Sequence, residues 1–132
     1  MNYETFIDRV AQRAGVSSDQ AVILTRATLE TLADRLTAGE ALDLAAQLPK
    51  RLQMPLRPRE ETAERFSLAE CIRRVGERAG VDEAAAANGV RAVFATLRQA
   101  VTGGEFEDLL AQLPSDFAEV AEPVAVRSGR RR

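Results

Sequence analysis

The feature that most constrains the fold is an internal repeat with an offset of 65 residues. When each residue from 7 to 49 is paired with the residue 65 positions later, 21 of the 43 pairs are identical and no gap is needed. Both copies end in Gln-Leu-Pro, at residues 47–49 and 112–114. An internal repeat fixes the architecture before any other feature is considered. Because two copies are too few for a solenoid, we expect a pseudo-symmetric pair of units packed face to face.

Each copy has the periodicity of three helices. In the first copy, apolar residues recur three and four positions apart over residues 3–14, 18–36 and 40–48, as on one face of a helix. Asn2 is placed to cap the first helix, and Gly15 follows its last apolar residue. The sequence therefore predicts an all-α fold, with two tandem pseudo-symmetric three-helix units packed as one helical bundle. The long helices should pack near the centre, and the Gln-Leu-Pro helices should close the ends of their units.

The length of 132 residues suits a single domain. We predict one all-α domain that ends near residue 120 and is followed by a disordered basic tail. The predicted bounds are 1–120 for the domain, about 3–53 and 67–118 for the repeats, 54–66 for the connector and 121–132 for the tail.

The second copy departs from the first inside its long helix. Asn88-Gly89 stands where the first copy has Ile23-Leu24. A glycine in the middle of a helix costs about 1 kcal/mol relative to alanine. Either the helix bends there, or the glycine lets another backbone approach closely. The alanines at 84–87 favour close packing.

Composition excludes several kinds of chemistry. The chain has no histidine and one cysteine, Cys71. An intramolecular disulfide, a Cys/His zinc site and histidine acid–base catalysis are therefore unavailable. Cys71 is expected to be a small core residue, because no histidine is present to activate it. The sequence predicts no catalytic residue, no cofactor and no metal site, so we expect that the protein is not an enzyme.

The charge distribution argues against a broad phosphate-binding surface. The net charge is −2, but four arginines lie in the last six residues, which leaves 14 basic and 20 acidic residues in the rest of the chain. The folded part is therefore acidic. The four tail arginines can contact nucleic acid, an acidic protein or anionic lipid, although a merely solubilising end explains them equally well. These candidate contact residues are Arg127, Arg130, Arg131 and Arg132.

Two likenesses to DNA-binding proteins fail beyond their first residues. Residues 9–17 look like the opening of a helix-turn-helix motif, and residues 2–44 look like the start of bacterial histone-like proteins. A recognition helix needs polar or basic residues at its beginning, whereas residues 18–24 are mostly acidic or apolar. Histone-like proteins need basic β-arms, but here a second helical unit takes their place. We therefore expect no DNA binding by the folded part.

Acidic residues are dense on the short helices. Glu40 and Glu105 fall in the first turn, where a negative charge interacts favourably with the helix dipole. Glu105, Glu107 and Asp108 are interpreted as a solvated helix face, since a carboxylate-bridged metal site in a bundle normally uses Glu-x-x-His motifs.

A repeated polar edge is the candidate interaction site. An aspartate and a glutamine four positions apart recur in both copies, and they share one edge of the short helix. The structural interpretation is that glutamine closes a helix end or bonds a loop carbonyl. The functional interpretation is that the edge contacts a partner. The residues are Asp43, Gln47, Asp108 and Gln112.

The repeated pattern Gly-Glu-x-x-Asp-Leu-x-Ala-Gln-Leu-Pro, at residues 39–49 and 104–114, resembles the bacterial family of domains of unknown function numbered 2267. The resemblance covers about residues 3–120. It implies an all-α fold and a bacterial source, and it implies no activity. The basic tail is outside the pattern.

Three functional hypotheses remain open. The first is a protein-interaction or regulatory module without catalysis, with an unknown protein partner. The second is a nucleic-acid accessory protein that acts only through the arginine tail. The third is a small-molecule or carboxylate-metal site between the repeats. Because no apolar run approaches the length of a membrane span, we expect a soluble cytoplasmic protein; its oligomeric state is left open.

Overall fold

The computed structural model describes residues 1–58 and 63–121, and this part of the chain is all-helical, as predicted. The helices are α1 Tyr3–Ala14, α2 Ser18–Arg35, α3 Ala38–Ala46, α4 Lys50–Gln53, α5 Leu68–Ala79, α6 Glu83–Ala100, α7 Gly103–Ala111 and α8 Ala118–Ala121, with short 3-10 turns η1 Met54–Leu56 and η2 Ser115–Phe117. None of the described helices is both long and apolar enough to span a membrane.

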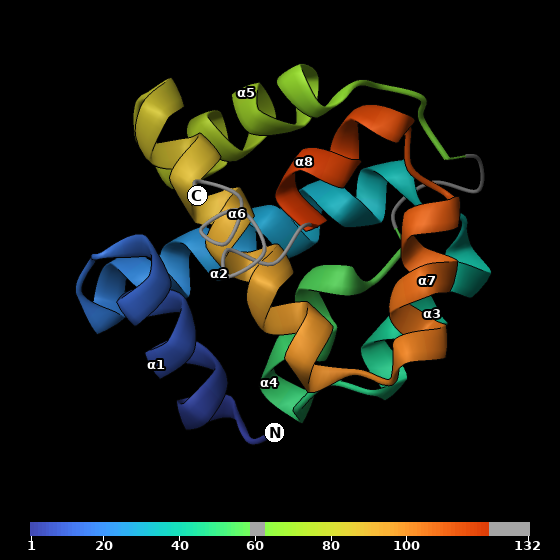
Figure 1. Cartoon of the computed structure of the whole chain (residues 1–132), viewed down its shortest axis with the longest axis horizontal. Helices are drawn as coiled ribbons and strands as arrows, with labels where there is room; N and C mark the ends of the chain where they lie inside the picture. Colours follow the sequence, from blue (N-terminus) through green and yellow to red (C-terminus); the bar gives the residue numbers. More distant parts are fainter. Residues whose placement is uncertain (59–62, 122–132) are drawn as a thin grey trace, which may run out of the picture.

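The two repeats are interlocked rather than side by side. The long helices α2 and α6 pack against each other at the centre (Figure 1). Helix α1 packs against α2 of its own unit and against α6 of the other, and α5 does the same with α6 and α2. Each unit therefore buries its first helix on the long helix of its twin. A single repeat would leave these faces exposed to water.

The expectation that the Gln-Leu-Pro helices close the ends of their units stays a prediction, and the structure adds a contact between these helices. Helices α3 and α7 contact each other across the boundary between the units (Figure 1). This contact brings equivalent residues of the two repeats together near the pseudo-two-fold axis.

Local signals set the ends of α1 as the sequence indicates. The side chain of Asn2 accepts a hydrogen bond of 2.8 Å from the backbone N–H of Thr5, which satisfies one orphan donor of the first turn. Gly15 ends the helix in the left-handed region, with φ +68°. A residue with a β-carbon is disfavoured in that conformation, and this accounts for the glycine.

The helical periodicity of the long helices predicts a seam that faces the core, formed in the first copy by Val22, Thr25, Leu29, Leu32 and Leu36, and most of this seam is buried. Along α2 and the residue after it, the seam residues Thr25, Leu29, Leu32 and Leu36 are all buried. Val22, the first seam residue, is only partly buried. The second copy has the same pattern, with Ala87 partly buried and the remaining positions buried; these are Val90, Phe94, Leu97 and Val101.

Both residues of the Asn88-Gly89 pair fit the neighbouring unit. A β-carbon added at Gly89 would lie 2.8 Å from Cδ2 of Leu24, so the glycine makes room for this buried side chain. The prediction of close packing is confirmed, although the approaching group is a side chain and not a backbone. Next to it, the Asn88 amide donates a hydrogen bond of 2.7 Å to the carbonyl oxygen of Ala14 at the end of α1.

Polar contacts also join the units in equivalent pairs. Arg13 of α1 donates a hydrogen bond of 2.8 Å to Thr96 of α6, and Arg78 of α5 donates one of 2.8 Å to Thr31 of α2. The pairs differ in one respect. Arg78 also forms an ion pair of 2.9 Å with Asp34, which is buried. In the other unit, position 99 carries a neutral glutamine instead of this carboxylate.

The described part of the predicted connector belongs partly to the core. Pro55 and Leu56 in η1 are buried, as is Leu52 in α4 just before them. At the other end, α8 extends to Ala121, which is buried and lies one residue beyond the predicted end of the domain. The remainder of the predicted tail, residues 122–132, lies outside the described residues.

Candidate functional site

Helices α3 and α7 hold each other through reciprocal glutamine contacts. The side-chain oxygen of Gln47, at the end of α3, accepts a hydrogen bond of 2.8 Å from the backbone N–H of Thr102, the residue that caps the start of α7. Gln112, at the end of α7, accepts the equivalent bond of 3.2 Å from the N–H of Thr37, which caps α3. The start of each helix thus lies at the end of the other, so the two helices run antiparallel.

These contacts favour the structural interpretation of Gln47 and Gln112 over the functional one. Each glutamine closes a helix end, but its partner is a backbone N–H of the opposite repeat and not a loop carbonyl. An amide–carbonyl hydrogen bond of this kind contributes about 1 kcal/mol. Asp43 and Asp108, the other two residues of the predicted edge, are exposed.

The same contacts change the role of the glutamates in the first turns of α3 and α7. Thr37 and Glu40 have the spacing of a capping box, in which the glutamate side chain bonds back to the N–H of the cap residue. Thr37 does cap α3, since its hydroxyl accepts from the N–H of Glu40 at 3.2 Å. Its own N–H is taken by Gln112. The carboxylate of Glu40 is therefore released from the capping box, and Glu105 is released in the same way.

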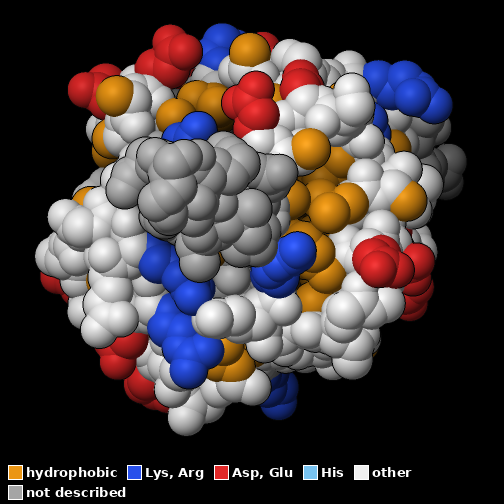
Figure 2. Space-filling view, viewed as in Figure 1, with side chains coloured by type: hydrophobic (Ala, Val, Ile, Leu, Met, Phe, Trp, Pro, Cys, Tyr) orange, Lys and Arg blue, Asp and Glu red, His pale blue; other side chains and the backbone are white. Residues whose placement is uncertain are grey.

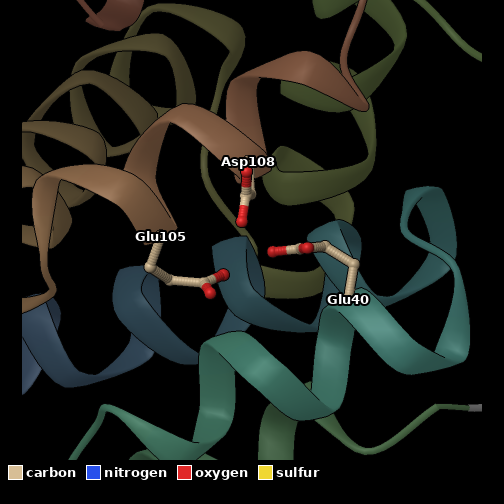
Figure 3. Close-up of side chains that lie close together, drawn as sticks. All are labelled: Glu40, Glu105 and Asp108. Carbon is tan, nitrogen blue, oxygen red and sulfur yellow. The ribbon is translucent and has the colours of Figure 1, made fainter.

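The released carboxylates meet between the helices. Figure 3 shows Glu40 reaching from α3 toward Glu105 on α7, with Asp108 pointing down between them. Oxygen atoms of the three groups all lie within 4.8 Å of one another. We call these three residues the carboxylate cluster. Glu40 and Glu105 are equivalent positions of the two repeats, so the cluster lies where the pseudo-symmetry brings like residues together.

Two members of the carboxylate cluster are buried with one oxygen atom each left without a hydrogen-bond partner. Glu40 is 7% exposed and Glu105 is 8% exposed. The Oε2 atom of each has no hydrogen-bond partner. An ionised carboxylate is an acceptor only, so two ionised glutamates cannot satisfy each other. No basic side chain of the described residues forms an ion pair with the cluster.

The environment favours the neutral form of Glu40. Burial, then the hydrogen bond and charge of Glu105, and then the charges of Asp108 and Asp43 raise the pKa of Glu40 to about 8. Desolvation and like charges both disfavour the ionised form of a carboxyl. Near neutral pH, and with no cation bound, Glu40 therefore holds a proton that it can donate to Glu105.

The interpretation of Glu105, Glu107 and Asp108 as a solvated face is wrong for one of the three. Glu107 and Asp108 are exposed, but Glu105 is buried. The sequence does contain a pattern that singles out Glu40 and Glu105 from the other acidic residues. Threonine and glutamate recur three positions apart in both repeats, at 37 and 40 and at 102 and 105. What the spacing cannot show is that glutamines of the opposite repeat displace the glutamates from their caps.

Cys71 is a core residue, as expected. Its side chain is inaccessible to water and is not oxidised to a disulfide. Burial raises the pKa of the thiol to about 12, so the thiolate that nucleophilic chemistry requires is not formed near neutral pH.

A second feature is an apolar groove beside α3. It has a volume of about 480 Å³ and is bounded by α3, α4 and η1. Leu42 and Met54 line it, and they are the two most exposed large hydrophobic residues described, at 58% and 65%. We call this the α3–α4 groove. The residues that line it are Leu42, Ala45, Ala46, Lys50, Gln53, Met54, Leu56 and Arg57.

Basic residues surround Met54. Lys50 and Arg57 line the α3–α4 groove. Lys50 and Met54 also line an adjacent hollow of about 500 Å³, together with Arg26, Arg51, Glu30 and Pro55. The two hollows therefore hold four basic residues and one acidic residue, in a chain whose net charge is −2.

No broad basic surface covers the face seen in Figure 2. Basic and acidic side chains are interspersed over its visible described residues, with hydrophobic surface among them. The four arginines predicted to contact an anionic partner, at 127, 130, 131 and 132, lie outside the described residues, so that hypothesis stays a prediction.

Comparison with known proteins identifies a family but no activity. The model of the family described as "Uncharacterized conserved protein (DUF2267)" matches residues 3–120. No curated protein matches the chain.

Proposed function

Because the chain belongs to the DUF2267 family of uncharacterized conserved proteins, which supplies no activity, we propose its function from its surface: it is a non-catalytic interaction module that binds an acidic, amphipathic segment of a partner protein in the α3–α4 groove. The observation that carries the proposal is the pairing of Leu42 and Met54. They are the most exposed large hydrophobic residues described, and they line the same hollow.

Apolar exposure of this kind favours a docking role. Scattered apolar residues on a surface need no explanation, whereas apolar residues that line a common groove with a polar rim mark interaction sites. The groove is shaped by helix α3 and the turn after it, so it offers a trough into which one face of a partner helix can pack.

The rim selects the charge of the partner. Lys50 and Arg57 flank the apolar floor, and Arg26 and Arg51 line the adjacent hollow. Opposite charges across an interface steer association and suppress wrong partners. A segment that carries leucine-like residues on one face and aspartate or glutamate on its edges fits this surface better than a basic segment does.

The chemistry of the chain supports a role without catalysis. The chain has no histidine, and its one cysteine is buried as a thiol. The carboxylate cluster brings three acids together, but glycoside hydrolysis needs two carboxylates about 5 Å or more apart on either side of the sugar, and Glu40 and Glu105 are buried and not open to a substrate.

Selection from a displayed library of random 16-residue peptides tests the proposal. The full-length chain is immobilised, and enriched peptides are sequenced and then measured individually for affinity. We expect acidic peptides with apolar residues three and four positions apart. Their affinity for the Leu42→Asp, Met54→Asp double variant should fall by about tenfold or more, which corresponds to at least about 1.4 kcal/mol.

A matched control separates groove binding from general stickiness. Ile23 is also exposed, at 43%, but does not line the α3–α4 groove. The Ile23→Asp variant should therefore bind the selected peptides as the parent does. If no peptides are enriched, or if both variants bind them equally well, the groove is not the docking site.

A further inference from the structure

The carboxylate cluster is the strongest unassigned chemistry in the molecule, and it does not depend on the α3–α4 groove. The sequence identifies no metal-ligating residues, although a carboxylate-metal site between the repeats is one of the hypotheses that it leaves open. The structure brings together three carboxylates that lie on two different helices, and two of them are contributed by equivalent positions of the repeats. We propose that Glu40, Glu105 and Asp108 bind one calcium ion at the boundary between the two repeats.

The side chains of Glu40 and Glu105 are not used to cap their helices. A capping-box glutamate would normally bond to the N–H of its cap residue. In this protein, Gln112 and Gln47 occupy those N–H groups of Thr37 and Thr102. The carboxylates are therefore available for another partner, and they turn toward each other between α3 and α7 (Figure 3).

The carboxylate cluster also contains a pair of unpartnered buried oxygens. The Oε2 atoms of Glu40 and Glu105 lack any hydrogen-bond partner, and both side chains are more than nine-tenths buried. A buried polar atom without a partner is costly, and a buried charge must be paired or coordinate a metal. Because no basic side chain of the described residues pairs with them, a cation can serve as their common partner.

The ligands select the kind of cation. All three donors are carboxylate oxygens, which are the ligands of hard cations such as calcium and magnesium. Ligand oxygens on opposite sides of a calcium ion are about 4.6–5.2 Å apart, and those around magnesium are about 4.0–4.2 Å apart. The three oxygens here all lie within 4.8 Å of one another, and calcium, whose coordination geometry is flexible, tolerates such an arrangement better than magnesium, which needs a near-ideal octahedron.

The exposure of the third ligand provides access. Asp108 is exposed whereas the two glutamates are buried. Calcium takes six to eight oxygen ligands, and water commonly supplies several of them. An ion bound here can therefore keep water on the Asp108 side while the glutamates hold it from within. Asp43 is close enough to Glu40 for its negative charge to raise the pKa of that carboxyl.

A shared proton is the competing occupant. One proton between Glu40 and Glu105 supplies one hydrogen bond and removes one negative charge. A calcium ion removes two and satisfies oxygens of all three carboxylates at once. The two occupants are distinguished directly by calorimetry, because only the ion binds with a measurable stoichiometry.

Isothermal titration calorimetry of the EDTA-treated, full-length chain with calcium chloride tests the proposal, with magnesium chloride in parallel. We expect one calcium ion per chain, weaker binding of magnesium and a rise in the melting temperature with calcium. Glu105→Gln should weaken calcium binding by about tenfold or more, because affinity depends on the number of charged ligands. Glu107→Gln is the matched control, since Glu107 is exposed on the same helix and outside the carboxylate cluster.

Several results would overturn the proposal. One is the lack of both binding heat and a melting shift up to millimolar calcium, which would leave a shared proton as the occupant. Another is equal loss of binding in Glu105→Gln and Glu107→Gln, which would indicate a diffuse attraction to acidic surface. Because Glu105→Gln removes a buried like-charge contact, we expect this variant to fold, and its circular dichroism spectrum verifies this.

Discussion

Replacement of Glu105 by glutamine should change how the stability of the protein depends on pH. In the folded protein, the pKa of Glu40 is raised from 4.5 to about 8, first by burial and then by Glu105 and the neighbouring aspartates. A group that binds its proton more tightly in the folded state stabilises the fold most below its unfolded pKa. That contribution is lost as the pH rises from about 4.5 through 8.

The magnitude can be worked out from the size of the shift. The free energy of unfolding changes by at most about 1.4 kcal/mol per pH unit for one proton. Between pH 5 and pH 8, the loss for Glu40 is therefore at most about 4 kcal/mol. Glu64 and Glu70 do not obscure the effect: arginine partners lower the pKa of both, so their contributions are lost below about pH 4.5.

The assay is urea unfolding monitored by circular dichroism at pH 5, 6, 7 and 8, with EDTA present. In Glu105→Gln, the neighbouring charge is gone and the new amide can donate to Glu40, so the pKa of Glu40 falls. The variant should lose less stability than the parent between pH 5 and pH 8, by about 1.4 kcal/mol for each unit by which the pKa of Glu40 falls. Glu107→Gln should behave as the parent does. Parallel profiles for Glu105→Gln and the parent would show that Glu105 does not raise the pKa of Glu40.

Two further predictions concern the contacts between the repeats. In Gly89→Ala, the new β-carbon would lie 2.8 Å from Leu24, and the overpacking cost of about 1–3 kcal/mol should outweigh the gain of about 1 kcal/mol in helix propensity. A double-mutant cycle with Leu24→Ala, measured by urea unfolding, should show that the effects of the two substitutions on the free energy of unfolding are not additive. Additive effects would mean that the two residues do not interact. Gln112→Ala should lower the unfolding free energy by about 1 kcal/mol, because the N–H of Thr37 loses its partner; an unchanged thermal melt would show that water replaces the glutamine at no cost.

The repeat made most of the fold predictable. The identity of 21 in 43 pairs, together with three amphipathic segments in the first copy, sufficed to predict two three-helix units. The end of α1 was set by Gly15 and its start by Asn2, and both are local effects that the sequence records directly. Burial of the seam from Thr25 to Leu36 was predictable from helical periodicity alone.

The arrangement of the units was not predictable in the same way. A repeat shows that two units are alike, but it does not show which face of one meets which face of the other. The antiparallel packing of α3 on α7 depends on the contacts of Gln47 with Thr102 and of Gln112 with Thr37, whose partners are 55 and 75 residues apart in the sequence. Local patterns carry no information about contacts over such distances.

A carboxylate-metal site between the repeats was one of the hypotheses, but the residues of the carboxylate cluster were not identified, for the same reason. Glu40 is an ordinary residue for the first turn of a helix, and nothing in the local sequence indicates that its twin lies opposite it. When a charged residue lies near a pseudo-two-fold axis, the symmetry places its equivalent from the other repeat next to it, and the two like charges then face each other. Asn88-Gly89 was the opposite case, because a break in the repeat marked the place where Leu24 packs.

The most direct test of this account is a site-resolved NMR titration of the Glu40 side-chain carboxyl carbon, with EDTA and with saturating calcium. Comparison with Glu40→Gln assigns the signal. Without calcium, the pKa of Glu40 should lie far above the ordinary range of a glutamate, and calcium should lower this pKa because the ion competes with the proton for the same oxygens. A Glu40 carboxyl that titrates in the ordinary range and ignores calcium would contradict this prediction, since the two glutamates would then not face each other across the repeats.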